Sequence, residues 1–223
     1  ELEGTKVSRA SVHNISIMES LKLGIGDTIK VFKANMIIPQ IAENITQSGT
    51  VRIPEVCPVC GGKTRISDVN DVKSLYCDNE QCQAKHIKSF ALLASRDALN
   101  IDGLSEATLE KFIQKGFLKR GDIFRISRYK DEITSMEGFG EKSYNNLIEA
   151  LEKAKDTDLV RVIYGLGIYN VGLSTARLIV NKLNNDPEAV LKATADELTD
   201  IDGIGEVIAE AFVEYFKNED KKD

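Results

Sequence analysis

The sequence predicts a multidomain α+β chain made of three small modules. Three observations support this division of the 223 residues. Short segments of alternating apolar and polar residues come first, as is typical of β-strands. Four cysteines follow within 26 positions, and the remaining half repeats one turn-and-helix signature four times. The predicted boundaries are residues 1–54 for the β-rich module, 55–88 for the cysteine module, 89–217 for the helical module and 218–223 for a polar tail.

The repeated signature of the second half carries the most information. It has the form apolar residue, any residue, Gly, apolar residue, Gly, except that Ser105 replaces the second Gly in the first copy and Asn170 replaces the first Gly in the third. By subtraction, the third positions are 35, 32 and 33 residues apart, so the copies are internal repeats. The four copies are Ile101 to Ser105, Met136 to Gly140, Ile168 to Gly172 and Ile201 to Gly205.

Each copy is expected to form a sharp turn that presents bare backbone. Gly and Asn tolerate positive φ, so the N–H groups of the turn can approach a partner closely. An amphipathic helix follows each copy, and the positive end of its dipole points the same way. The signature therefore resembles the helix-hairpin-helix motif, in which such a turn holds a nucleic-acid phosphate. The candidate DNA-binding residues of the repeats are Gly103, Gly138, Gly140, Asn170, Gly172, Gly203 and Gly205.

A simpler interpretation stays open, since Gly-rich turns can also merely connect packed helices. The residue that should pack against the partner helix is small in the last two copies, Ala176 and Ala209. It is bulky in the first two, Leu109 and Tyr144, so these copies are expected to be weaker. Recurrence at a regular spacing nevertheless favours the binding interpretation over the connecting one.

The four cysteines have the spacing of a structural metal site. Cys57 and Cys60 form a C-x2-C knuckle, and Cys77 and Cys82 form a C-x4-C pair after sixteen intervening residues. Four thiolates suit tetrahedral Zn²⁺ and leave no open position for catalysis. Two disulfides are the alternative, which a reducing cytosol disfavours. We expect one structural zinc ion whose binding supplies the folding energy of this module.

The first module contains four segments with strand patterns and one short helical segment. The strands are expected over residues 6–12, 28–33, 36–41 and 50–53, and the helix over 15–23. Pro39 places the third strand at an edge or a bulge, because Pro cannot donate to a sheet ladder. Several short strands around one short helix suit a small β-barrel of the OB type, although an irregular β-meander fits the pattern too.

Three stretches of this module resemble the OB-fold of bacterial NAD-dependent DNA ligases. They are Val7 to Asn14, Ile25 to Thr28 and Lys33 to Gln40. The family forms of the first and last stretches are close to S-R-A-T-L-H-N and R-A-G-D-V-I-P. The resemblance continues in the same order through the cysteines and all four hairpins, so it covers nearly the whole chain. In the last stretch this chain departs from the family form at Lys33, Asn35, Met36 and Ile37.

The resemblance implies a portion of an enzyme that joins a 3′-hydroxyl to a 5′-phosphate at a nick in duplex DNA. The family's nucleotidyl lysine lies in K-x-D-G, and this chain has no such motif; its only D-G pairs, at residues 102–103 and 202–203, belong to hairpins. The NAD-binding N-terminal region and the BRCT domain of the family are missing too. We therefore expect no catalytic residue and no self-adenylation in this fragment. NAD and Mg would serve the parent enzyme and would not be bound here.

The same resemblance assigns partners and contact residues. The expected partners are nicked double-stranded DNA and the N-terminal adenylation domain in cis, with no membrane contact, in the cytoplasm and associated with the nucleoid. Arg9 and Lys33 are the candidate phosphate contacts, and Ile37 and Ile38 are candidates to press on the minor groove. Ordinary barrel core is the other interpretation of these two isoleucines, because adjacent strand residues point to opposite faces. The functional alternatives are a stand-alone architectural DNA-binding module and a protein-interaction scaffold.

The charge of the chain limits how it can bind DNA. The net charge is −6, and the segment from residue 90 onward carries −7. A generic DNA-coating protein would be basic, so this balance argues against that class. Binding through oriented backbone amides needs few cations and predicts only a moderate dependence on salt. The sequence contains no run of about 18 apolar residues and predicts no membrane span.

Overall fold

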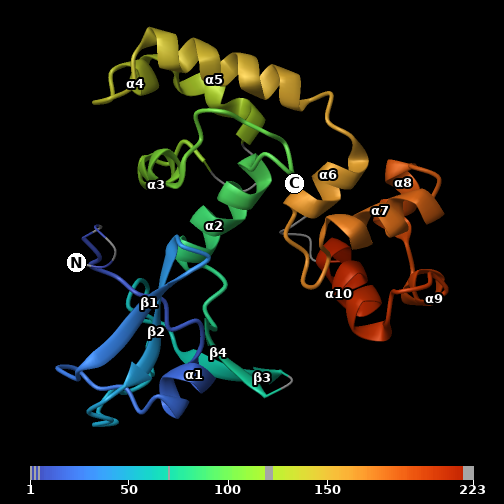
Figure 1. The fold of residues 1–223 in the computed structure, drawn as a ribbon. Helices are drawn as coiled ribbons and strands as arrows, with labels where there is room; N and C mark the ends of the chain where they lie inside the picture. Colours follow the sequence, from blue (N-terminus) through green and yellow to red (C-terminus); the bar gives the residue numbers. More distant parts are fainter. Residues whose placement is uncertain (1, 3, 5, 70, 119–122, 218–223) are drawn as a thin grey trace. The chain divides into compact units, whose positions relative to one another are not determined.

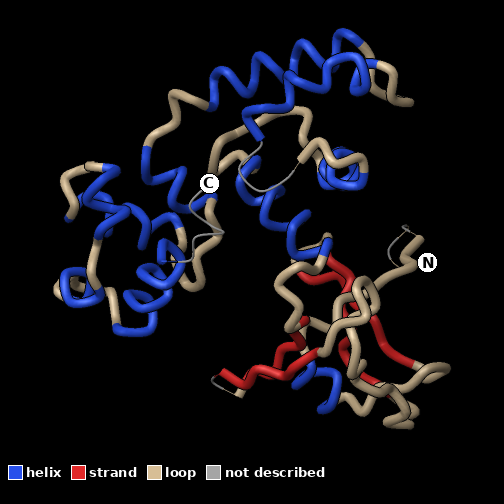
Figure 2. The backbone as a smooth tube through the Cα atoms, turned by 180° about the vertical axis from the view of Figure 1, so that it is seen from behind, coloured by secondary structure: helices blue, strands red, loops and turns tan. Residues whose placement is uncertain are grey.

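The computed structural model describes residues 2, 4, 6–69, 71–118 and 123–217 (Figure 1). Contacts divide the chain into two compact units, residues 1–83 and 84–223. The three-module division stays a prediction, since the β-rich and cysteine segments share the first unit. The predicted polar tail, residues 218–223, lies outside the described part. Within the described residues, the strands belong to the first unit, and the second unit is helical (Figure 2).

The helix expected over residues 15–23 is present but shorter, as α1 (Ile15–Ser20). Asn14 caps its first turn: the side-chain Oδ1 accepts a hydrogen bond from the N–H of Ile17 at 2.9 Å. An asparagine cap satisfies one of the amides that have no partner inside a helix. The helix is therefore started by a local side-chain contact that the sequence encodes.

The sheet that follows α1 is a single antiparallel pair. β1 (Ile29–Ala34) runs beside β2 (Ile38–Asn44), and Lys33 lies opposite Pro39. The turn between them has two residues with positive φ, 50° at residue 35 and 62° at residue 36. Positive φ at both central positions is the conformation of a type I′ turn, which matches the twist of two paired strands. The hairpin therefore ends in a tight tip.

Two of the four expected strands do not form, which corrects the sequence prediction. In the segment 6–12, Ser11 alone makes a bridge to β2, and its N–H donates to the carbonyl of Pro39 at 2.8 Å. Residues 50–53 form no strand, and the N–H of Val51 donates instead to the loop after α1 at 3.1 Å. The hydrogen bonds of these two segments go to isolated partners rather than to a continuous ladder.

Asn44, at the end of β2, is the one fully buried polar residue of the described chain, with 1% of its surface exposed. Its side-chain NH₂ donates to the carbonyls of Leu21 and Lys22, both at 3.0 Å, directly after α1. The same nitrogen lies 2.7 Å from Oδ2 of Asp27 in the turn before β1. One amide therefore joins α1, the turn and the sheet.

The cysteine segment contains the second hairpin of this unit. β3 (Thr64–Val69) pairs with antiparallel β4 (Val72–Cys77). The hairpin packs on α1, where Oγ of Ser16 accepts from the N–H of Lys73 at 2.9 Å and donates to the carbonyl of Asp71 at 3.1 Å. The β-rich and cysteine segments are therefore held together by specific polar contacts.

The elements that follow β4 are all helices in the described residues. None of them combines the length and the apolar character needed to span a membrane. In order they are α2 (Gln83–Ala94), α3 (Glu106–Gln114), the 3₁₀ helix η1 (Ile123–Tyr129), α4 (Lys130–Thr134), α5 (Glu141–Ala154), α6 (Leu159–Gly165), α7 (Leu173–Lys182), α8 (Pro187–Lys192), α9 (Ala195–Thr199) and α10 (Glu206–Lys217).

Two hydrophobic cores hold these helices. The first consists of buried residues between Phe90 and Ala154, and the second of buried residues between Ile163 and Phe212. The apolar residues of the first two hairpins pack in or against the first core, and those of the last two belong to the second. The four repeats are therefore organised as two pairs, each of which buries its own core.

Replacing Asn44 with Ala should destabilise the first unit by about 1–3 kcal/mol, because the two carbonyls after α1 would be left without a donor. Urea unfolding followed by circular dichroism measures this free energy. Asn145 is an exposed asparagine on α5, so its replacement with Ala should change stability by less than about 0.5 kcal/mol. Equal effects of the two variants would contradict the role given to Asn44.

Candidate nucleic-acid interface and metal site

The four hairpins share one backbone conformation at their third residue. The φ angles are 92° at Gly103, 80° at Gly138, 59° at Asn170 and 87° at Gly203. This is the left-handed region, which Gly adopts freely and Asn adopts more readily than most residues. The sharp turn expected at each repeat is therefore present in all four copies.

Burial follows the same pattern in every hairpin. The apolar first and fourth residues are buried or half-buried, and the second, third and fifth residues are exposed. In the fourth copy, for example, Ile201 and Ile204 are 8% and 4% exposed. The apolar pair anchors the turn in the core, and the backbone between and after the pair faces solvent. The turns can therefore meet a dissolved anion.

The helices that follow the hairpins differ in how their first amides are used. At α3, Oγ of Ser105 accepts a hydrogen bond from the N–H of Thr108 at 3.2 Å. Gly140 and Gly172 cap α5 and α7 without any side-chain hydrogen bond. First-turn N–H groups have no partner inside a helix and lie at the positive end of its dipole. At α5 and α7 these donors stay available to an anion.

Nothing in the described part of the chain sterically requires glycine at the fifth position of the last three hairpins. The φ angles of Gly140 and Gly172 are −123° and −79°, which any residue adopts. A Cβ atom built on Gly140, Gly172 or Gly205 would meet nothing within 4 Å. Glycine loses more conformational freedom on folding than any other residue. What the missing side chains provide is room for a partner that approaches from outside.

In each copy, the residue six places after the hairpin's third position should pack against the partner helix. The size of this residue does not distinguish the four copies. All four residues at this place are buried, and each copy keeps the same turn. The hydroxyl of Tyr144 donates to the carbonyl of Ser127 at 3.4 Å, so this large side chain is accommodated with its polar end paired. The four residues are Leu109, Tyr144, Ala176 and Ala209.

Within each pair, a hairpin lies against the helix of the other copy. A Cβ on Gly103 would lie 4.0 Å from Cβ of Leu147 on α5. A Cβ on Gly203 would lie 3.8 Å from Cδ1 of Leu178 on α7. This packing fixes each of these turns relative to the other helix of its pair.

The tip of the β1–β2 hairpin exposes three consecutive apolar side chains. Met36, Ile37 and Ile38 are 80%, 77% and 50% exposed. The barrel-core interpretation of Ile37 and Ile38 is therefore wrong, because the first belongs to the turn and the second begins β2. Met36 is a surface residue that sequence reasoning missed. The signal that could have found it was an apolar residue directly after a turn-forming Asn.

Arg9 and Lys33 come from segments that lie on the two sides of β2. Lys33 pairs with Pro39 from β1, and Ser11, two residues after Arg9, donates to the carbonyl of the same proline. Arg9 is exposed and Lys33 is half-buried. The fold therefore brings both segments close to the apolar tip, and their contact with DNA stays a prediction.

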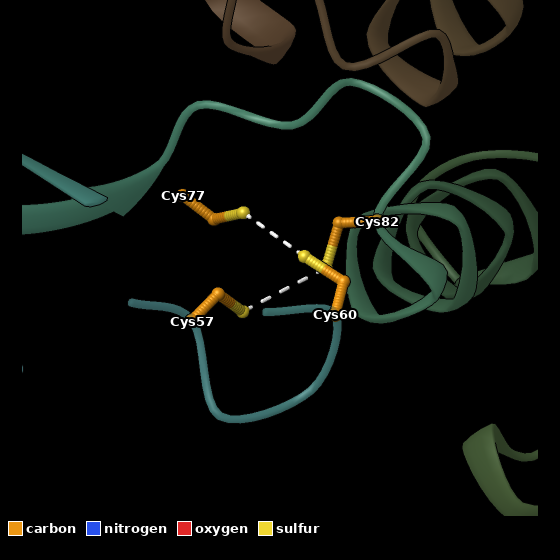
Figure 3. A group of neighbouring side chains, drawn as sticks. All are labelled: Cys57, Cys60, Cys77 and Cys82. Carbon is orange, nitrogen blue, oxygen red and sulfur yellow. Dashed lines mark hydrogen bonds between the residues drawn. The ribbon is translucent and has the colours of Figure 1, made fainter. Parts of the chain in front are cut away.

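The four cysteine sulfurs converge on one point (Figure 3). All Sγ atoms lie within 4.8 Å of one another. The Cys60–Cys77 distance is 3.5 Å and the Cys57–Cys82 distance is 4.0 Å, and all four are free thiols rather than disulfides. Tetrahedral Zn²⁺ with Zn–S bonds of about 2.3 Å requires sulfurs about 3.8 Å apart. The donor set therefore fits a single ion.

The environment of the first cysteine pair favours thiolates. The N–H of Gly62, 3.4 Å from Sγ of Cys60, lowers the pKa of that thiol to about 6 with help from Asn79. Backbone N–H groups of the knuckle likewise lower the pKa of Cys57. Burial, reinforced by the neighbouring sulfurs, raises the pKa of Cys77 to about 12. A bound cation would be needed to keep all four groups deprotonated together.

Glycines let the knuckle close around this point. Gly61 has a φ of 69° and completes the turn. A Cβ on Gly62 would lie 2.9 Å from Cβ of Asn79 and 3.3 Å from Sγ of Cys60. The absence of a side chain at Gly62 therefore allows the loop of the second cysteine pair to approach the first.

Comparisons with known protein families follow the same divisions. Residues 1–52 match the model of the NAD-dependent DNA ligase OB-fold domain. Residues 95–153 match a SAM-like helix-hairpin-helix tandem, and residues 161–223 match a helix-hairpin-helix motif. The two helical matches separate the first pair of hairpins from the second, as the two cores do.

The whole chain is similar to bacterial DNA ligases. It is 60% identical over 223 residues to the DNA ligase of Lachnoclostridium phytofermentans and 58% identical over 223 residues to that of Ruminiclostridium cellulolyticum. It is 39% identical over 228 residues to that of Thermosipho africanus. In each case all of this chain is covered, but only 34% of the relative.

These findings confirm the resemblance to NAD-dependent DNA ligases that the motifs predicted. They also confirm the predicted fold class, with an OB-type β module, a four-cysteine cluster and tandem helix-hairpin-helix elements.

Proposed function

We propose that this chain is the DNA-binding portion of an NAD-dependent DNA ligase that seals nicks in duplex DNA. Similarity to bacterial DNA ligases along the whole chain supports this class of enzyme. The match of residues 1–52 to the OB-fold domain of NAD-dependent ligases supports NAD as the source of AMP. NAD and Mg would act in the adenylation domain, which is the partner in cis, and the enzyme would work on nucleoid DNA in the cytoplasm.

The observation that carries the proposal is the set of four exposed turns. Each turn offers backbone N–H groups beside the positive end of a helix, and three of them leave open space at Gly140, Gly172 and Gly205. Phosphate oxygens accept hydrogen bonds from such groups. Phosphates are the same at every step of a duplex, so these contacts carry no sequence information. An enzyme that acts at any nick requires this property.

The hairpin of the first unit would add a different kind of contact. Apolar side chains in a minor groove press on sugars and base steps, and nearby cations neutralise phosphates. The exposed tip at residues 36–38, with Arg9 and Lys33 on the two flanking segments, has this composition. The DNA-binding residues that we propose are Arg9, Lys33, Met36, Ile37, Ile38, Gly103, Gly138, Gly140, Asn170, Gly172, Gly203 and Gly205.

We also propose that Cys57, Cys60, Cys77 and Cys82 hold one structural zinc ion. Four thiolates complete the tetrahedral shell and leave no position for a substrate. The β3–β4 hairpin cannot bury a core of its own, since Ile66 is 47% exposed and Leu75 37% exposed. The ion would therefore supply much of the folding energy of this segment.

Replacing Gly172 and Gly205 together with Ser should weaken binding to a nicked duplex by about tenfold, because each new hydroxyl would compete for amides that the phosphate uses. Stability should change by less than about 0.5 kcal/mol, since Ser is a good N-cap. Fluorescence anisotropy with a labelled duplex measures the affinity, and thermal unfolding measures the stability.

The matched control for the hairpin prediction is Ser105→Gly. This change frees the N–H of Thr108, so it should leave affinity equal or higher while costing a few tenths of a kcal/mol of stability. If the double serine variant bound DNA as tightly as the original chain, the turns would not be the phosphate contacts.

Elemental analysis of the purified chain should find one zinc ion per molecule. Replacing Cys82 with Ser should lower the metal content and expose the first unit to proteolysis, because the hairpin would lose its source of folding energy. Val59 is in the knuckle with its side chain 58% exposed, so Val59→Ser should keep the metal. A metal-free chain that resists protease as well as the native one would contradict the assignment.

The role in ligation can be tested by mixing. The chain alone should not join a nicked duplex, and adding it to a separately prepared adenylated N-terminal portion should raise joining above the level of that portion alone. Gel analysis of end-labelled nicked DNA measures the product. Tight DNA binding without any gain in joining would favour the stand-alone architectural module, and an absence of DNA binding would favour the protein-interaction scaffold.

A further inference from the structure

The four hairpins are not electrostatically equivalent. Three of them carry an exposed carboxylate at the second position and another on the first residue of the following helix. The third hairpin has Tyr169 and Leu173 at these two places. Tyr169 is 57% exposed, and no charge lies beside the third turn at either position. The flanking carboxylates of the other copies are Asp102 and Glu106, Glu137 and Glu141, and Asp202 and Glu206.

The helix after the third hairpin is also less acidic than the helices after the other hairpins. α7 contains no acidic residue, whereas α3, α5 and α10 each contain at least two. Its exposed side chains recur at helical spacing and form one stripe. Neither of the two cations in that stripe makes an ion pair with any described residue. The stripe consists of Ser174, Arg177, Leu178, Asn181 and Lys182.

Arg177 is a cation at a position where the other three copies have an acidic or a neutral residue. It is the fifth residue of α7, and the fifth residues of α3, α5 and α10 are Glu110, Asn145 and Glu210. All four side chains are exposed, so packing does not decide which residue stands there. The cation is therefore a local property of the third copy.

The α7 stripe also borders the fourth turn. Leu178, one residue after Arg177, lies 3.8 Å from the place of a Cβ on Gly203. Tyr169 of the third hairpin lines a hollow of about 530 Å³ with residues of α10, including Val207. A duplex that meets the third turn would therefore also come close to the fourth.

On the basis of the proposed function, we propose that the third hairpin and the exposed stripe of α7 form the main backbone-phosphate contact of the helical unit, with Arg177 as a phosphate-binding side chain. The occupant is duplex DNA, because charge complementarity favours a polyanion on the one hairpin helix without carboxylates. A guanidinium can hold two phosphate oxygens at once. The other three turns would hold phosphate through amides while their carboxylates oppose it, less strongly at the first and second turns, where Lys88 pairs with Glu106 and Lys130 with Glu141.

Arg177→Gln tests this inference in the 223-residue chain. Its affinity for a nicked duplex should fall by about tenfold at low salt, equally for different base sequences. The slope of log affinity against log salt should become shallower by about 0.9, the value for one lost phosphate contact. Arg128→Gln removes the same charge from an exposed residue of η1 in the other pair, and should change the affinity by less than about twofold.

A second variant acts in the opposite direction. Glu210→Arg places a cation at the equivalent position of the fourth copy and should tighten binding by about three- to tenfold. Thermal unfolding of each variant shows that the fold is kept. Unchanged affinity and slope for Arg177→Gln, in a chain that itself binds the duplex, would overturn this inference and leave the proposed function standing. Failure of the original chain to bind the duplex would overturn the proposed function.

Discussion

The helical unit depends on burying two apolar residues at each hairpin, one before and one after the exposed turn. Ile201 and Ile204 show the arrangement, since both side chains enter the second core while the residues between them face solvent. The positive φ of Gly203 lets the chain reverse between these two anchors. The same contacts that stabilise the core therefore aim the backbone N–H groups outward. A substitution at one of these buried apolar residues would therefore change the stability of the core and the position of the anion-binding amides together.

The first unit is held together in another way. Among its described residues, the buried apolar side chains are Ile15 and the cysteines Cys57 and Cys82. A small domain with so little buried surface needs a metal, a crosslink or a partner to be stable. Here a buried amide at Asn44 and a convergent set of thiols replace a hydrophobic core. The exposed apolar tip of the β1–β2 hairpin is consistent with this, because the proposed contact with DNA would bury side chains that the unit itself leaves exposed.

The negative net charge of the helical unit is compatible with phosphate binding through backbone amides. Orientation of amides and helix ends can attract a phosphate where the average charge would repel it. Several carboxylates are also already paired: Glu106 with Lys88 at 2.7 Å, Glu141 with Lys130 at 3.6 Å. Exposed pairs of this kind contribute little stability, but they reduce the local repulsion near the first and second turns. The distribution of charge therefore matters more than its sum.

The sequence by itself determined the features that depend on local chemistry. Positive φ at four spaced residues, helices after each turn, and four cysteines at zinc-like spacing follow from single residue types and short intervals. β1 and α1 were also predicted within a few residues, because residues 28–33 have a strand pattern and residues 15–23 a helical one. Tertiary structure alone decided the rest. Residues 6–12 and 50–53 have strand patterns, yet a ladder requires a partner at the right distance, and their hydrogen bonds went elsewhere. The burial of Asn44 and the grouping of hairpins into two pairs arise from contacts between residues far apart in the chain, which local patterns do not encode.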